Sequence, residues 1–322
     1  MRIIIISIAL VFLLPTAAQA QSGEYELHKI RALNQTIEAS GDPIDIYYPN
    51  IRNRSKRPAL PIQFPVIVFL QGALVEKEFY SVLGQNIAKH GFVVMIPDHT
   101  SGILNDRFPE LTVITQALEH VRIEDETIGS PLFGIVDPSR LGIAGHSFGG
   151  AAIAFGINGF CGFPFCNPSS GFVMPPELKA AAFLSGNSGG VPLNNSGLPA
   201  LVIYGEFDRS NQNGRDFYET MSAPRVFIEI EGANHFGLND VSEPRGANFD
   251  RGEAEQMVPQ AISAASYGRW AGLFFRAHIK YDQDAWRRIY GGLTPEPGVT
   301  LISEPGPQPR RWPTDKRQKN RR

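Results

Sequence analysis

The sequence has 322 residues, of which 43% are hydrophobic and 19% charged, as expected for a globular protein with a sizeable core. Its formal net charge is −2, but residues 305–322 contain seven lysines and arginines against one aspartate, so the rest of the chain is acidic. An acidic body argues against nucleic-acid binding. Beyond the N-terminal region no apolar stretch is long enough to span a bilayer, so we predict no transmembrane segment.

Residues 1–20 have the pattern of a cleavable secretory signal peptide. Arg2 supplies a positive charge, residues 3–14 form an apolar run too short for a stable membrane helix, and residues 18–20 (Ala-Gln-Ala) match a cleavage site. We therefore expect a periplasmic or secreted protein with Gln21 as its mature N-terminus. An uncleaved N-terminal anchor is the less favoured alternative, and the lack of a cysteine at position 21 argues against a lipid anchor.

The exported chain is predicted to form one catalytic domain, residues 21–304, followed by a short tail. This length suits one large α/β domain better than two small ones. The tail, residues 305–322, is rich in proline and basic residues and poor in apolar ones, so we expect it to be disordered. A solvated chain end is favoured over an anchor for an anionic surface. The oligomeric state stays open.

Apolar periodicity predicts strands that alternate with helices along most of the domain. Continuous apolar runs such as Pro65–Leu70 are typical of strands buried on both faces of a parallel sheet. Two leading strands, 26–33 and 43–48, come before the buried strand and the first helix, which indicates an antiparallel start. The predicted fold class is therefore α/β, with a mostly parallel central sheet flanked by helices. The predicted strands are 26–33, 43–48, 65–70, 92–96, 140–144, 178–185, 199–204 and 225–230, and the predicted helices are 78–89, 111–123, 151–157, 216–221, 253–280 and 284–289.

Residues 145–149, Gly-His-Ser-Phe-Gly, form a G-x-S-x-G motif between a predicted strand and a predicted helix. A tight strand-to-helix turn of this kind exposes the serine hydroxyl, and flanking glycines let neighbouring backbones pass close to a strained residue. The start of the following helix adds backbone N–H groups beside a developing oxyanion. Ser147 is therefore the candidate nucleophile, and an ordinary glycine-rich turn is the alternative.

A serine nucleophile needs a general base and an acid that orients it, and in this architecture the chain order is Ser, acid, His. Asp208 lies in the loop after one predicted strand and His235 in a glycine-flanked loop after the next, which satisfies that order. Glu206 is the alternative acid. His278 also follows the acid, but it falls within a helical pattern, where a packing role is favoured.

The oxyanion hole needs two backbone donors. One is expected from Phe148, the residue after the nucleophile, and the other from the loop after the strand that ends at Leu70. In that loop Ala73 is the first choice and Leu74 the second. Leu74, His99 and His146 are candidates for lining the substrate pocket, although a plain loop histidine is an equal alternative for His99.

The two cysteines of the chain, Cys161 and Cys166, lie in one short segment. In an oxidising compartment a disulfide is the leading interpretation, and two free thiols are the alternative. Two cysteines without a nearby histidine pair are too few for a zinc site, and we predict neither a metal nor a cofactor. The surrounding segment, 161–176, is rich in glycine, proline and phenylalanine and is a candidate lid or pocket wall.

Three stretches resemble one branch of the α/β-hydrolase superfamily: residues 145–150 (Gly-His-Ser-Phe-Gly-Gly), Phe79-Tyr80, and residues 87–94 (Ile-Ala-Lys-His-Gly-Phe-Val-Val). That branch contains plasma-type platelet-activating-factor acetylhydrolases, chlorophyllases and bacterial polyester hydrolases, and the resemblance covers roughly Pro43 to His235. It implies an α/β-hydrolase fold and a carboxyl-ester hydrolase without cofactor.

Carried over by position, Ser147, Asp208 and His235 match the triad of this branch, and Ala73 and Phe148 match its oxyanion donors. One departure concerns the residue after the third strand, where the branch usually has His-Gly and this chain has Gln71-Gly72. The departure puts the local hydrogen bonding of the oxyanion loop in doubt. Chlorophyll is an improbable substrate for an exported protein.

These observations favour hydrolysis of a carboxylic ester through an acyl-enzyme, with a small-molecule or lipid-like ester as substrate. Cleavage of an amide or peptide by the same triad is one alternative. A binding protein that keeps the fold without the chemistry is another, and it predicts loss of a triad member. Short acyl esters, phospholipids and polymeric esters are not distinguished by the sequence.

Overall fold

A computed structural model describes the protein over residues 29–50, 63–99, 107–210, 212–245 and 253–306. The predicted signal peptide and all but the first two residues of the predicted tail lie outside these ranges. Within them, no helix is both long enough and apolar enough to cross a membrane.

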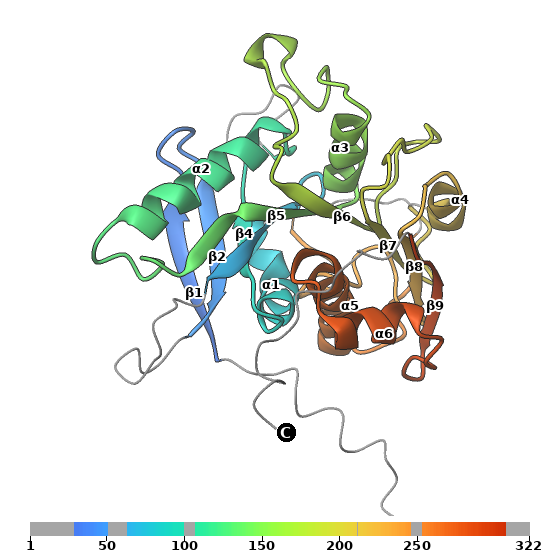
Figure 1. The fold of residues 1–322 in the computed structure, drawn as a ribbon. Helices are drawn as coiled ribbons and strands as arrows, with labels where there is room; N and C mark the ends of the chain where they lie inside the picture. Colours follow the sequence, from blue (N-terminus) through green and yellow to red (C-terminus); the bar gives the residue numbers. More distant parts are fainter. Residues whose placement is uncertain (1–28, 51–62, 100–106, 211, 246–252, 307–322) are drawn as a thin grey trace, which may run out of the picture.

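The described residues form one nine-stranded sheet with the order β1-β2-β4-β3-β5-β6-β7-β8-β9 (Figure 1). The neighbours from β4 through β3, β5, β6 and β7 to β8 are parallel, whereas β1, β2 and β9 pair antiparallel with their neighbours. The predicted α/β class is confirmed, including its antiparallel start. The strands are β1 (Ile30–Thr36), β2 (Pro43–Pro49), β3 (Phe64–Leu70), β4 (Val93–Pro97), β5 (Val136–His146), β6 (Leu178–Leu184), β7 (Ala200–Gly205), β8 (Arg225–Ile230) and β9 (Val299–Glu304).

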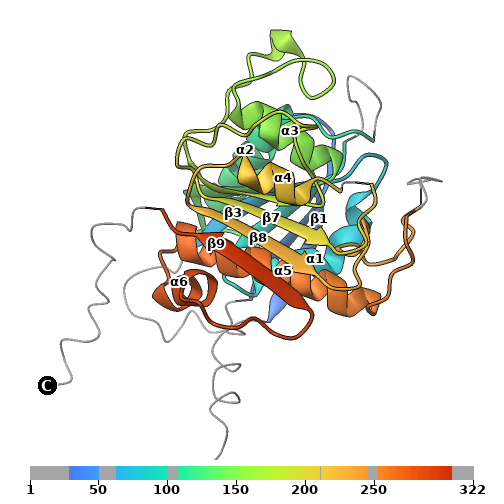
Figure 2. The same cartoon turned by 90° about the vertical axis from the view of Figure 1, so that its right-hand side faces the viewer.

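Helices cover both faces of the sheet. In Figure 2, α2, α3 and α4 lie on one side of the strands and α1, α5 and α6 on the other. Because helices pack on both faces, a central strand such as β3 is buried along its whole length, which explains its continuous apolar sequence. The α-helices are α1 (Ser81–Ala88), α2 (Thr112–Glu126), α3 (Phe148–Ile157), α4 (Gly214–Glu219), α5 (Gln260–Ile279) and α6 (Gln283–Tyr290), and two short 3-10 helices are η2 (Lys77–Tyr80) and η3 (Pro168–Ser170).

Two hydrophobic cores follow from this layering, one on each face. The helix α5 shows why its sequence forms a buried helix: Tyr267, Trp270 and Phe274 recur at helical spacing and are all at most 1% exposed. They pack with Tyr80 and Leu83, from the segment that leads into α1 and from α1 itself. The helices of the opposite face, α2 and α3, cover the second core.

Most predicted elements agree with the structure apart from their ends, for example β5, which begins at Val136, and three differ further. The predicted helix 253–280 begins only at Gln260, because the residue before a proline is disfavoured in the α conformation and Pro259 takes an extended ψ of 130°. The first strand is shifted to Ile30–Thr36. β9 was not predicted, since it is a half-buried edge strand whose hydrogen bonds depend on pairing with β8.

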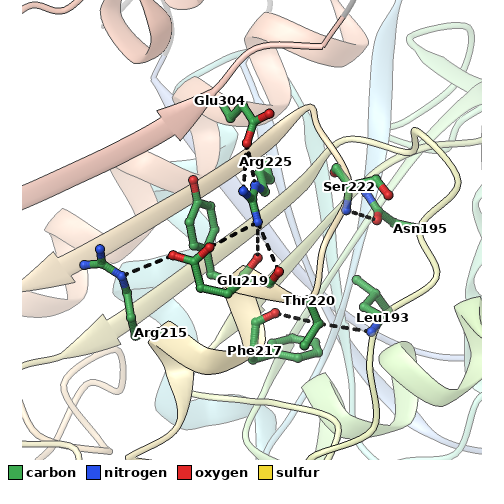
Figure 3. Close-up of polar contacts among 10 residues, drawn as sticks. Leu193, Asn195, Arg215, Phe217, Glu219, Thr220, Ser222, Arg225 and Glu304 are labelled. Atoms are coloured by element: carbon green, nitrogen blue, oxygen red, sulfur yellow. Dashed lines mark hydrogen bonds and ion pairs between the residues drawn. The ribbon is translucent and has the colours of Figure 1, made fainter.

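Arg225, at the start of β8, ties this edge of the sheet together (Figure 3). Its guanidinium contacts Glu304 of β9 at 2.8 Å and donates to the backbone carbonyls of Tyr218 and Glu219 at the end of α4, each at 3.2 Å. It also lies over the ring of Tyr218. One planar side chain thus joins a helix C-terminus and two strands, which suits the fork geometry of arginine.

Candidate active site

Ser147 occupies a sharp turn between β5 and α3. Its backbone has φ 49° and ψ −114°, in a region that non-glycine residues rarely adopt. A Cβ added at Gly149 would lie 2.4 Å from the carbonyl oxygen of Leu70, and one at Gly145 would lie 2.5 Å from the carbonyl carbon of Gly149. The glycines of the motif are therefore required by the close approach of β3 and α3 to the turn.

The structure brings the three predicted triad residues together from three loops. The Nε2 of His235 lies 3.0 Å from the Oγ of Ser147, and its Nδ1 lies 2.9 Å from Oδ1 of Asp208. Asp208 follows β7 and His235 follows β8, and both are at most 5% exposed. Parallel neighbouring strands place these loops at the same edge of the sheet, where α/β folds bind ligands.

Glu206, the alternative acid, and His278, the other histidine that follows it, make hydrogen bonds with residues outside the triad. The carboxylate of Glu206 accepts a hydrogen bond from the backbone N–H of Gly232 at 2.9 Å. His278 is buried in α5, where its Nε2 lies 2.9 Å from the hydroxyl of Tyr290. Burial lowers the pKa of His278 to about 3, so this histidine is neutral at physiological pH.

The two candidate donors in the oxyanion loop differ in their hydrogen bonds. The backbone N–H of Leu74 donates to the carbonyl oxygen of Arg107 at 2.8 Å, whereas the N–H of Ala73 has no acceptor among the described residues. Phe148 is the first residue of α3, so its N–H has no acceptor within the helix. Ala73 and Phe148 therefore have N–H groups available to a ligand, and Leu74 does not.

The prediction that His146 lines the substrate pocket is wrong. Its side chain is fully buried, with Nδ1 2.9 Å from the hydroxyl of Tyr80 and Nε2 3.1 Å from the backbone carbonyl of His235. The side chain points into the protein, where the rings of Tyr80 in η2, His235 and Phe236 pack against it. Burial, together with the proximity of His235, holds the pKa of His146 well below its ordinary value.

His99 is likewise buried rather than pocket-lining, at 6% exposed. Its two ring nitrogens lie 3.6 Å from Oδ2 of Asp42 and 3.8 Å from Oε1 of Glu110. The ring is therefore held between carboxylates that lie just before β2 and just before α2.

Leu74, the third candidate for lining the pocket, is half-buried and has φ 65°, in the left-handed region.

Gln71, where the related branch has histidine, is 2% exposed. Its Oε1 has no hydrogen-bond partner among the described residues. The neighbouring Gly72 donates its backbone N–H to the hydroxyl of Tyr80 at 2.8 Å. Tyr80 therefore supplies a side-chain acceptor to the backbone of this loop, and Oε1 of Gln71 does not. Sequence reasoning noted Tyr80 in the resemblance but assigned it no role.

Cys161 and Cys166 form a disulfide that closes a short loop after α3. Inside this loop Phe165 packs on Phe148, the neighbour of the nucleophile, with ring centroids 5.1 Å apart. Phe163 is 63% exposed and so does not belong to this wall. The loop thus places one aromatic side chain, and not the whole phenylalanine-rich segment, beside the turn at Ser147.

The described residues contain no group of three or more His, Cys, Asp or Glu side chains placed to hold a metal ion. The arrangement has a hydroxyl, an imidazole and a carboxylate in hydrogen-bonding sequence, and the N–H groups of Ala73 and Phe148 have no acceptor among the described residues. These are the components that acyl transfer requires.

Comparison with known proteins identifies the family of the chain. A family model described as PET hydrolase-like matches residues 16–246. Cutinase est2 of Thermobifida alba is 25% identical over 233 residues, which cover 71% of this chain and 68% of that protein. Cutinase 2 of Thermobifida cellulosilytica is 26% identical over 232 residues, which cover 70% of this chain and 78% of that protein. The chain therefore belongs to the PET hydrolase-like family and is a carboxylic ester hydrolase of the α/β-hydrolase superfamily.

Proposed function

We propose that the enzyme cleaves carboxylic esters through an acyl-enzyme formed on Ser147, with His235 as general base and Asp208 as the orienting acid. The observation that supports this proposal best is the unbroken chain of contacts, 3.0 Å from Ser147 to His235 and 2.9 Å from His235 to Asp208. The nearly complete burial of both partners keeps water from competing for these contacts.

The direction of each hydrogen bond follows from the chemistry of its partners. The carboxylate of Asp208 only accepts, so Nδ1 of His235 carries the proton and Nε2 is left to accept from the hydroxyl of Ser147. As the Oγ attacks the ester carbonyl carbon, its proton passes to Nε2, and the imidazolium is stabilised by Asp208. The imidazolium then protonates the departing alcohol, and water repeats the sequence to release the acid.

The negative charge that develops on the carbonyl oxygen requires two donors. We assign these to the backbone N–H groups of Phe148 and Ala73. The support is that neither N–H has an acceptor among the residues that the structure describes, whereas the N–H of Leu74 donates to the carbonyl of Arg107. One backbone donor of this type lowers the barrier by about 3–4 kcal/mol in serine hydrolases.

For the substrate we propose an extended polyester. The family description and the names of the cutinases support this class. The aromatic side chains of Phe108 and Phe165 flank Phe148 at ring-centroid distances of 5.0 and 5.1 Å, so the nucleophile stands beside apolar surface. Such a surface suits the hydrocarbon part of an ester chain.

We further propose that the enzyme acts outside the cytoplasm. The signal-like pattern of residues 1–20 supports export. The disulfide between Cys161 and Cys166 is compatible with an oxidising compartment. Comparing the mass of the protein in cell extract and in the exported fraction tests this directly, since cleavage after Ala20 removes the first 20 residues.

Replacing Ser147 by alanine tests the triad. We expect p-nitrophenyl butyrate hydrolysis to fall by at least about 10⁴-fold, because the residual rate comes only from binding and the oxyanion donors. Ser139, exposed at the opposite end of β5, is the matched control, and Ser139→Ala should retain full activity. Near-wild-type turnover or fluorophosphonate labelling in Ser147→Ala would contradict the assignment.

Two further measurements separate the alternatives. Matched ester and amide substrates with the same acyl group distinguish an esterase from a peptidase, and we expect faster turnover of the ester. A panel of esters with increasing chain length, extended to a polyester film, tests the substrate class. Activity confined to short soluble esters would contradict the polyester proposal while leaving the triad intact.

A further inference from the structure

We propose that Tyr80 and His146 act together as positioning residues that hold the oxyanion loop, the nucleophile turn and the loop of the base in one fixed arrangement. The inference rests on the proposed function, because it assigns roles relative to Ser147, His235 and Ala73. Neither side chain hydrogen-bonds to a reacting atom, since His146 meets His235 through its backbone carbonyl and by ring packing, so the effect of the pair is on geometry.

Three hydrogen bonds connect the catalytic loops through this pair. The backbone N–H of Gly72 donates to the hydroxyl oxygen of Tyr80 at 2.8 Å. The Tyr80 hydroxyl lies 2.9 Å from Nδ1 of His146, and Nε2 of His146 lies 3.1 Å from the carbonyl oxygen of His235. Tyr80 and His146 are both fully buried, so no solvent competes for these bonds.

The hydrogen-bond directions are uniquely determined. A carbonyl oxygen only accepts, so Nε2 of His146 must carry the proton and donate it to His235. Nδ1 is then an acceptor and receives the Tyr80 hydroxyl proton, which leaves the Tyr80 oxygen to accept from Gly72. Because burial lowers the pKa of His146, the neutral ring that this pattern requires is the stable form.

Each anchor point lies next to a proposed catalytic group. Gly72 precedes Ala73, whose N–H is the proposed oxyanion donor, and His146 precedes Ser147. The third anchor is the backbone of His235 itself. A single chain of hydrogen bonds therefore spans all three loops, and a shift at one end is transmitted to the others through rigid rings.

Packing reinforces the same connection. A Cβ added at Gly72 would lie 2.6 Å from Nδ1 of His146, so the imidazole rests directly against the oxyanion-loop backbone. The ring of His146 also contacts those of Tyr80 and His235, with centroids 5.8 and 4.9 Å apart. The pair thus has no room to reorient while the loops stay in place.

The sharpest test is Tyr80→Phe, which removes one oxygen and keeps the ring. Tyr290→Phe is the matched control, because its hydroxyl also lies 2.9 Å from a buried histidine nitrogen, on His278 in α5, remote from the catalytic loops. We expect Tyr80→Phe to lower kcat for p-nitrophenyl butyrate about 10- to 100-fold with little change in KM. Tyr290→Phe should leave kcat unchanged even where it lowers the melting temperature.

An inhibitor separates lost positioning from lost stability. An aryl trifluoromethyl ketone adds to Ser147 as a hemiketal, whose oxyanion occupies the proposed hole while His235 holds the proton. We expect its inhibition constant in Tyr80→Phe to rise by the same factor as kcat/KM falls. An unchanged kcat and an unchanged inhibition constant in the folded variant would overturn the inference. Full activity in Ser147→Ala would instead overturn the proposed function, so the two failures are distinguishable.

A second pair of variants serves if Tyr80→Phe does not fold. His146→Gln keeps an acceptor oxygen and an NH2 donor group, whereas His146→Leu keeps neither at similar size. The inference predicts that the glutamine variant retains a higher kcat and tighter ketone binding than the leucine variant. Equal kcat and equal ketone binding in the two variants would refute a role for the hydrogen-bond chain.

Discussion

The carboxylate of Asp240 accepts hydrogen bonds from the backbone N–H and the hydroxyl of Ser81, a residue 159 positions earlier in the chain. Its other oxygen accepts the N–H of Val82 at 2.9 Å, so Asp240 caps the N-terminus of α1 from outside the helix. In return the N–H of Asp240 donates to the carbonyl of Phe79. The loop that follows His235 is therefore fastened to the segment that carries Tyr80.

Replacing Asp240 by alanine should destabilise the protein by about 1–2 kcal/mol, because three donors at the start of α1 lose their acceptor. We also expect a lower kcat, since the His235 loop loses its attachment. Asp240→Asn retains one acceptor oxygen and should fall between the wild type and the alanine variant. Urea denaturation and ester hydrolysis measured on the same samples check both effects, and an unchanged midpoint would rule out the cap.

Gly149→Ala should impair folding or activity severely. The added methyl group would lie 2.4 and 2.5 Å from the backbone oxygens of Leu70 and Gln71, so the oxyanion loop and the turn must separate. We expect a loss of about 1–3 kcal/mol in the free energy of unfolding. Gly156→Ala on the same helix is the control, because the atoms nearest to its added Cβ are the side-chain ends of Met174 and Leu111 and not backbone. Equal melting temperatures for the two variants would contradict the steric argument.

Removing the Cys161–Cys166 disulfide should cost about 2 kcal/mol, the value expected from chain entropy for so short a loop. The double serine variant should still hydrolyse p-nitrophenyl acetate, since the triad lies outside the loop. Loosening the loop frees Phe165 from its contact with Phe148, so we expect KM to rise more for long-chain than for short esters. Identical KM values across the chain-length series would show that this loop does not line the substrate path.

The protein should lose stability on acidification partly through His278. Its pKa is about 3 in the folded state because of burial, against about 6.5 when unfolded. Between these values the unfolded state binds the extra proton, so the free energy of unfolding falls as pH falls through 6.5, by up to about 1.4 kcal/mol per pH unit.

His278→Gln removes the titrating group and tests this linkage. We expect the variant to show a shallower decline of stability between pH 6.5 and pH 4 than the wild type, whatever its stability at pH 8. Guanidinium denaturation across that range is the measurement. If the free energy of unfolding declined equally with pH in the wild type and in the variant, the folded-state pKa of His278 would not be depressed.

Local sequence determined much of the fold and part of the candidate site. The glycines around Ser147 and the apolar strand before them form a local pattern that predicts a strand-turn-helix unit from neighbouring residues alone. Asp208 and His235 each follow a strand of a predicted parallel sheet, and the loops after such strands lie at the same edge of the sheet, so the two side chains were expected to lie close together. These features could be predicted because they need no knowledge of distant contacts.

Tertiary structure decided what each side chain faces. The strand pattern of β5 does not show what His146 faces, and only the tertiary structure shows that Tyr80 of η2 lies 2.9 Å from its Nδ1 and that the ring is buried. The choice of Ala73 over Leu74 depends on the carbonyl of Arg107, and β9 exists as a strand only because β8 pairs with it. Hydrogen bonds between residues far apart in the chain have no periodic signal, because their geometry arises only when the sheet and both helical layers have assembled.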